Sequence, residues 1–302
     1  GYYTNVHWLH TLYQQNFSAE NTQIQRAIYV EGVGTKAGKP DNPVGLGLGI
    51  SDTGVIAKTD EAVVNLIQGI QQGLVSINNM LEGKSFLIKN IQFDIFGFSR
   101  GAAAARHFAN RIFSKDDAIV AAIRQGIGEV EYHGEPEGKT RFLGIFDTVA
   151  AIGTPSNGLN PHTADTGDVN IVLRPGVAEK VFHITAQNEC RFNFALNSVK
   201  PAWPELALPG VHSDIGGGYL PLERENLFIS RPLVETVPFT RPGEQTRVYQ
   251  QTVHEQGVLN LAPTIAPLMR TNKFSVETWY DDRMPQDRYG NFQKRSFAAL
   301  VM

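Results

Sequence analysis

Residues 91–106 have the sequence IQFDIFGFSRGAAAAR. The apolar run at 91–98 is typical of a buried strand, and the alanine-rich run after Gly101 is typical of a helix. Between them stands the pattern G-x-S-x-G, in which two glycines leave room for a strained turn that exposes the serine at the strand tip. We therefore predict Ser99 as a nucleophile, with the Arg100 N–H at the helix N-terminus as an oxyanion donor.

The pattern alone leaves a second interpretation open. A serine before a helix often does no more than cap it, because its hydroxyl accepts hydrogen bonds from the first N–H groups of the helix. Whether Ser99 is a nucleophile therefore depends on an acid and a base elsewhere in the chain.

Composition narrows the class of protein. The chain has 302 residues, of which 42% are hydrophobic and 19% are charged, as expected for one large globular domain with an appendage. The net charge of -3 and the lack of a lysine-arginine tract argue against a nucleic-acid partner.

The single cysteine, Cys190, has no second cysteine for a disulfide or a zinc site, so we expect it to be a core residue and we expect no metal site. No run approaches the roughly 18 apolar residues of a membrane span, so any action on lipid is expected to be peripheral.

Regular structure is also predicted before the serine turn. Thr4 and Asn5 can cap a helix whose apolar residues recur every three or four positions up to Tyr13. Residues 27–30, AIYV, resemble a short buried strand, and residues 59–80 have the pattern of a long amphipathic helix.

The segment at 36–53 is rich in glycine and proline and contains GLGLG at 45–49. These glycines fit a dinucleotide-binding loop poorly, because Pro43 precedes them in place of a strand and no helix follows them directly. We expect a mobile loop here, and we expect no cofactor.

An acid follows the next apolar run. Residues 141–146, RFLGIF, are predicted as a buried strand, and Asp147 stands at its end, where an α/β-hydrolase keeps the acid of its triad. The alternative is that Asp147 caps the turn that follows. A further strand is predicted at 181–186.

A base is expected in the segment PGVHSDIGGGY at 209–219. His212 follows proline and precedes three glycines, which predicts a shaped loop from which an imidazole can reach a serine. Among the other histidines, His183 sits inside a predicted strand and is kept as a reserve. His107 lies on a helix and is predicted to face away from the serine turn.

Ser99, Asp147 and His212 occur in the chain order of an α/β-hydrolase triad. In that arrangement His212 takes the serine proton, Asp147 fixes the imidazole tautomer, and Ser99 attacks an acyl carbon. We therefore predict an α/β fold with a mainly parallel central sheet flanked by helices over residues 1–220. The pattern weakens after that, and residues 221–302 are predicted to be a cap, lid or membrane-facing region rather than a sheet domain.

Several motifs in order give the chain a family resemblance: GVGT at 32–35, GFSRGAAAAR at 97–106, FLGIFDTV at 142–149, ECRFNF at 189–194 and PGVHSDIGGGY at 209–219. These resemble the signatures of type VI secretion lipase effectors of the first class, which are antibacterial phospholipases. The family's nucleophile, acid and base fall on Ser99, Asp147 and His212.

The resemblance implies phospholipase A activity on acyl esters of membrane glycerophospholipids. Of the two acyl positions, we favour the sn-1 ester. It also implies delivery from the producer's cytoplasm by a secretion spike protein, action in the periplasm of a target bacterium, and an immunity protein in the producer.

One departure from the family is clear. Members of the family open with a strand ending in Asp-Gly-Thr before the helix that matches residues 5–13, and no such segment is present. We therefore expect that the polypeptide has further sequence before Gly1.

Two other functions stay open at this level. A carboxylesterase or another acyl hydrolase of the same fold would carry the same triad, because a triad does not name its substrate. A non-catalytic binding module that kept the fold is the second. Arg100 and Arg106 suit a lipid phosphate, but an arginine on a short helix more often pairs with a carboxylate.

Overall fold

The computed structural model describes residues 3–13, 17–18, 23–33, 54–150, 168–189, 191, 194–219, 228–263, 266, 270 and 273–302. The chain divides into two compact units. The first contains residues 1–150, 165–189 and 196–221, and the second contains residues 151–164, 190–195 and 222–302.

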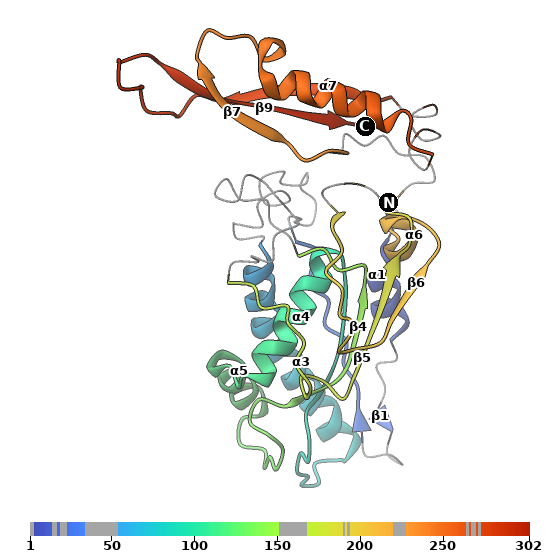
Figure 1. The fold of residues 1–302 in the computed structure, drawn as a ribbon. Helices are drawn as coiled ribbons and strands as arrows, with labels where there is room; N and C mark the ends of the chain where they lie inside the picture. The colour runs from blue at the N-terminus through green and yellow to red at the C-terminus, as the bar shows by residue number, and fades with distance from the viewer. Residues whose placement is uncertain are drawn as a thin grey trace. The chain divides into compact units, whose positions relative to one another are not determined.

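A parallel sheet of four strands in the order β3-β4-β5-β6 forms the centre of the first unit (Figure 1). These strands are β3 (Gln92–Phe98), β4 (Lys139–Phe146), β5 (Lys180–Ala186) and β6 (Glu205–Leu208). The helices among the described residues of the unit are α1 (Asn5–Leu12), α3 (Val55–Met80), α4 (Arg100–Phe113), α5 (Asp117–Ile127) and α6 (His212–Gly216). An antiparallel pair, β1 (Phe17–Ser18) and β2 (Gln23–Ile24), lies outside this sheet. The predicted α/β class with a mainly parallel central sheet is therefore confirmed.

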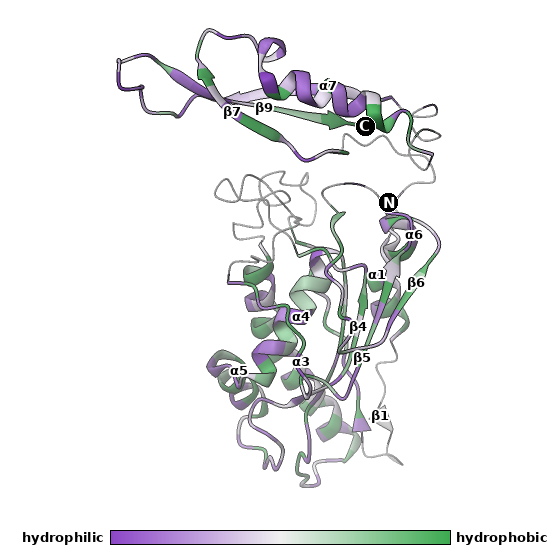
Figure 2. Ribbon diagram, in the orientation of Figure 1, coloured by the Kyte–Doolittle hydropathy of each residue, from purple (hydrophilic) through white to green (hydrophobic). Residues whose placement is uncertain are grey.

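Helix α4 packs directly on the sheet, and its alanines explain how closely it does so. Ala102, Ala105 and Ala109 are buried and form one core cluster with Leu143 and Ile145 of β4. Small side chains on this face let the helix backbone come near the strands. The contact is stabilised because it removes apolar surface from water. In Figure 2 the central strands are mostly hydrophobic, as strands covered by helices should be.

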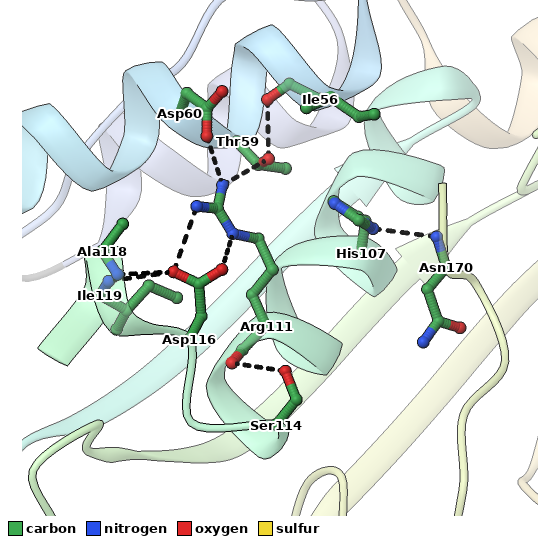
Figure 3. Close-up of polar contacts among 10 residues, drawn as sticks. All are labelled: Ile56, Thr59, Asp60, His107, Arg111, Ser114, Asp116, Ala118, Ile119 and Asn170. Atoms are coloured by element: carbon green, nitrogen blue, oxygen red, sulfur yellow. Dashed lines mark hydrogen bonds and ion pairs between the residues drawn. The ribbon is translucent and has the colours of Figure 1, made fainter. Parts of the chain in front are cut away.

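Helices α3, α4 and α5 are joined by a polar cluster around Arg111 (Figure 3). The Arg111 guanidinium donates to both oxygens of Asp116, at 2.9 and 3.3 Å, to Asp60 Oδ1 at 2.7 Å and to Thr59 Oγ1 at 2.9 Å. Asp116 in turn caps α5 by accepting from the Ala118 N–H at 2.9 Å. Burial favours a raised pKa for the Asp116 carboxyl, but the hydrogen bonds and charge of Arg111, together with the N–H groups of Ala118 and Ile119, hold that pKa below its ordinary value.

We expect Arg111→Met to lower the free energy of unfolding by about 2 kcal/mol, because it leaves two carboxylates without their common cation. Chemical denaturation of the purified protein checks this. Arg124→Met is the matched control, since Arg124 is an exposed residue of α5. Equal stability of the two variants would contradict the anchoring role of Arg111.

The early part of the chain departs from prediction at one place. The predicted strand at 27–30 is wrong, because these residues have no regular structure. Ile28 instead packs on α3, where a Cβ on Gly69 would lie 2.8 Å from its Cδ1. The helices at 5–13 and 59–80 are found as α1 and α3, with α3 beginning four residues earlier than predicted. Both the loop at 36–53 and Cys190 fall outside the described residues.

The second unit is a sheet, so the prediction that 221–302 is not a sheet domain is wrong. Its antiparallel strands are β7 (Leu233–Pro238), β8 (Ser275–Asp281) and β9 (Gln293–Val301), in the order β7-β9-β8, with η3 (Gly243–Gln245) and α7 (Arg247–Leu259) between β7 and β8. Pro232 and Pro242 interrupt the sequence pattern but stand outside these strands. Figure 2 shows α7 and the connection from β8 to β9 as mainly hydrophilic.

Across the described ranges, none of the helices is both long enough and apolar enough to pass through a membrane.

Candidate active site

Ser99 stands in the turn between β3 and α4, as the G-x-S-x-G pattern predicts. Its φ of 57° and ψ of -126° lie in a region that side chains rarely adopt, so the turn is strained. The backbone holds it there: the Ser99 N–H donates to the Phe146 carbonyl at 3.0 Å, and the Ser99 carbonyl accepts from the Ala102 N–H at 3.0 Å. A Cβ on Gly97 would lie 2.3 Å from the Gly101 carbonyl oxygen, so only glycine fits there.

Asp147 follows β4 directly and is buried. Its φ of 38° is also positive, and its N–H donates to the Ile184 carbonyl of β5 at 2.7 Å. One carboxylate oxygen, Oδ1, accepts from the Ala186 N–H at 2.9 Å. The backbone of β5 thus fixes the orientation of the carboxylate and leaves Oδ2 for another partner.

That partner is His212. Its Nδ1 lies 2.6 Å from Asp147 Oδ2, and the imidazole is buried. A carboxylate oxygen only accepts, so Nδ1 carries a hydrogen, and in a neutral imidazole Nε2 is then the basic nitrogen. The predicted loop is wrong in one respect, because His212 is the first residue of the short helix α6 and its N–H donates to Glu189 Oε2 at 3.1 Å.

The three side chains belong to one edge of the sheet. Phe98 pairs with Phe146 in the register of β3 and β4, so Ser99 and Asp147 follow neighbouring strand ends. The Phe98 ring lies 4.5 Å from the His212 ring, centroid to centroid, which brings the histidine beside the serine turn. A Cβ on Gly216 would lie 2.0 Å from the Phe98 ring, so this contact requires glycine. Parallel sheets place their sites at such carboxyl edges.

Arg100 opens α4 directly after Ser99, which is the place that the sequence predicts for an oxyanion donor. The N-terminal N–H groups of a helix have no carbonyl partner within the helix and lie at the positive end of its dipole. The role of the Arg100 N–H stays a prediction. In the part of the chain that the structure describes, no group of three or more His, Cys, Asp or Glu side chains is arranged to hold a metal ion.

Known proteins give an independent comparison. A family model described as the catalytic domain of a Tle1-like phospholipase effector of the type VI secretion system matches residues 117–236. The solved structure of the Tle1 effector bound to the VgrG spike is 42% identical in sequence, with a TM-score of 0.65, and the match covers 99% of this chain and 57% of that chain.

The chain belongs to the Tle1-like phospholipase effector family.

The family model contains Asp147 and His212, and Ser99 precedes it. An uncharacterized protein from Pseudomonas aeruginosa is similar at 27% identity over 54% of this Tle1-like chain and 23% of its own, with a TM-score of 0.27. No curated protein matches. The chain spans 57% of the length of the Tle1 structure that it matches.

A second buried histidine holds the residue that follows Asp147. His183, the reserve candidate, is fully buried in β5. Its Nε2 accepts the Thr148 N–H at 3.1 Å, so Nδ1 carries the hydrogen and donates to Glu205 Oε2 at 3.0 Å. Both ring nitrogens are therefore engaged, and His183 orients the residue after Asp147 instead of serving as the base. The sequence gives no signal for this pairing, because strand register alone brings Glu205 beside His183.

The segment after Asp147 is also held by Asn197. The Asn197 N–H donates to the Thr148 carbonyl at 2.9 Å, and Asn197 Oδ1 accepts from the Ala150 N–H at 2.7 Å. Arg106 is buried and donates to the carbonyls of Asn197 and Ile171, at 2.6 and 2.7 Å. Burial lowers the pKa of Arg106 to about 10. The expectation of a carboxylate partner for Arg106 is therefore replaced by two carbonyl partners, and its guanidinium is turned inward.

Burial also gives a pH prediction. It lowers the pKa of His183 from 6.5 to about 4, although the Glu205 carboxylate raises it in part. As pH falls through this window the unfolded chain binds a proton that the folded protein does not, so stability contributed by neutral His183 is lost toward acid. In the parent, this effect should lower the free energy of unfolding by up to about 3 kcal/mol toward acid pH, and His183→Gln should not show it.

The measurement is the free energy of unfolding against pH for the parent, His183→Gln and the control His133→Gln, whose imidazole is exposed. The acid side of the curve should flatten in His183→Gln alone. A parent-like slope in that variant would contradict the assignment.

Proposed function

We propose that this chain carries the catalytic unit of a serine phospholipase A that cleaves acyl esters of membrane glycerophospholipids, with Ser99, Asp147 and His212 as its triad. The observation that carries the proposal is the 2.6 Å contact between His212 Nδ1 and Asp147 Oδ2 beside the Ser99 turn. Membership of a family described as phospholipase effectors supports the lipid substrate.

In the proposed mechanism His212 Nε2 takes the Ser99 hydroxyl proton as Oγ attacks the ester carbonyl. The oxyanion that forms is stabilised by the Arg100 N–H at the start of α4. Asp147 stabilises the imidazolium, which then protonates the departing alkoxide to release lysophospholipid. Water, deprotonated by His212, cleaves the acyl-serine ester and releases fatty acid.

The remaining parts of the proposal follow the family. The related Tle1 effector is bound to a VgrG spike, and we propose that a spike protein also carries this chain out of the producer. Action in the target periplasm, an immunity protein in the producer and a cap or lid role for residues 221–302 belong to the same proposal. We place cleavage at the sn-1 ester.

The test uses vesicles of a phosphatidylglycerol with a different fatty acid at each glycerol position. Mass spectrometry of the released fatty acid and the remaining lysolipid identifies the bond that is cleaved. Release of the sn-1 chain supports the proposal as stated. Release of the sn-2 chain alone would show that the enzyme cleaves the sn-2 ester instead. Hydrolysis of a soluble short-chain ester without hydrolysis of vesicles would favour an ordinary carboxylesterase. The absence of both activities would contradict the catalytic role.

A further inference from the structure

The end of β7 and the connection from β8 to β9 lie at the same end of the second unit's sheet (Figure 1). Four large rings in these two segments are exposed. We name them the aromatic tip. Their exposed fractions are 43% for Phe239, 58% for Tyr280, 72% for Tyr289 and 69% for Phe292. Single exposed apolar residues need no explanation, but a gathered set of rings does.

Two of these rings contact each other, and Phe292 is joined to them through its backbone. The Phe239 N–H donates to the Phe292 carbonyl at 3.1 Å, and the Phe239 and Tyr280 rings meet edge to face at 6.3 Å between centroids. The Lys294 ammonium lies 4.8 Å from the Tyr280 ring and 5.6 Å from the Phe239 ring. A cation over ring faces is an attractive contact, so the rings are already in place before any partner binds.

The fourth ring stands on an ordered turn. Asp287 Oδ1 accepts the N–H groups of Tyr289 and Asn291, at 2.8 and 2.9 Å, and Gly290 supplies a φ of 81°. The Arg288 guanidinium lies over the Tyr289 ring at 4.7 Å. Tyr289 is therefore presented on a preorganised turn with a cation beside it.

The charge of the tip differs in sign from that of the chain. Residues 239–241 and 280–295 contain five basic and three acidic residues, whereas the whole chain has a net charge of -3. Asp281 is paired with Arg283 at 2.8 Å. Among the other charged residues of these two segments, the basic ones outnumber the acidic ones. Exposed rings combined with a local positive charge suit a surface that is anionic outside and apolar beneath.

We infer that the aromatic tip docks on the surface of an anionic phospholipid bilayer. Tyrosine and phenylalanine insert at the boundary between headgroups and acyl chains, and lysine and arginine are attracted by anionic headgroups. The inference rests on the proposed function in that the bilayer is the substrate, but docking requires no catalysis. Because charges contribute, binding weakens as salt is added.

The test measures sedimentation with vesicles of phosphatidylcholine, with and without phosphatidylglycerol. The Ser99→Ala background keeps the vesicles intact. Tyr289→Ser combined with Phe292→Ser removes two exposed rings. Val64→Ser combined with Val75→Ser is the control, since both valines are exposed on α3. We expect the tip variant to bind phosphatidylglycerol vesicles at least about tenfold more weakly than the control.

The outcomes separate docking from catalysis. Hydrolysis of a soluble short-chain ester, measured with Ser99 present, should be unchanged by the tip substitutions, which shows that the first unit is intact. A parent-like thermal melt shows that the second unit, which carries the substitutions, is folded as well. Equal vesicle binding by the tip and control variants would overturn the inference, as would equal binding to neutral and anionic vesicles. Binding that depends on the tip, in a protein that hydrolyses no ester, would uphold docking and contradict the proposed function instead.

Discussion

Ser99→Ala is expected to lower phospholipid hydrolysis by at least about 10⁴-fold, while the protein stays folded. The hydroxyl is the only group of this side chain that alanine lacks, and the turn is held through its backbone, by the bonds of Ser99 to Phe146 and Ala102. The loss should therefore fall on kcat, with the thermal midpoint little changed.

The measurement pairs fatty-acid release from vesicles with a thermal melt of the same sample. Ser114→Ala is the matched control, because Ser114 is an exposed serine at the other end of α4. Parent-like release by Ser99→Ala would remove Ser99 from the mechanism.

Asp147→Asn is expected to lower kcat by about 10⁴-fold. In the parent, Asp147 Oδ1 is engaged by the Ala186 N–H, and Oδ2 accepts from His212 Nδ1. An amide that keeps its oxygen on Ala186 turns its NH₂ toward His212, which favours the tautomer with hydrogen on Nε2. That tautomer cannot accept the serine proton.

Two readouts separate this from a loss of structure. Proton NMR should lose the low-field signal of the His212 Nδ1 hydrogen, and KM should change far less than kcat. Asp117→Asn, at an exposed position in the first turn of α5, serves as the control. An Asp147→Asn variant with parent-like kcat would show that Asp147 is only a turn residue.

The sequence predicts those parts of the candidate site that depend on residues close together in the chain. The serine turn needs Gly97 because of the approach of Gly101, and Asp147 is found simply by following a buried strand to its end. Each of these features depends on a few consecutive residues. The assignment of His212 needed only the chain order and its glycine-rich surroundings, although the sequence did not show that it begins a helix.

What the sequence could not predict depends on contacts between distant segments. His183 reaches Glu205 and Thr148 only because β4, β5 and β6 align in register. Residues 27–30 have the composition of a strand, yet Ile28 finds a partner on α3 instead of a neighbouring strand. In the second unit β7 pairs with β9 across more than fifty residues, a pairing that no local period reveals.

The proposed mechanism requires Ser99 to be a nucleophile that His212 and Asp147 activate. The most direct measurement is the mass of the protein and its peptides after reaction with a fluorophosphonate, which modifies activated serines. We expect one adduct, on the peptide that contains Ser99. It should be absent in Ser99→Ala and form far more slowly in Asp147→Asn. An adduct on another residue, or undiminished hydrolysis after complete labelling of Ser99, would contradict it.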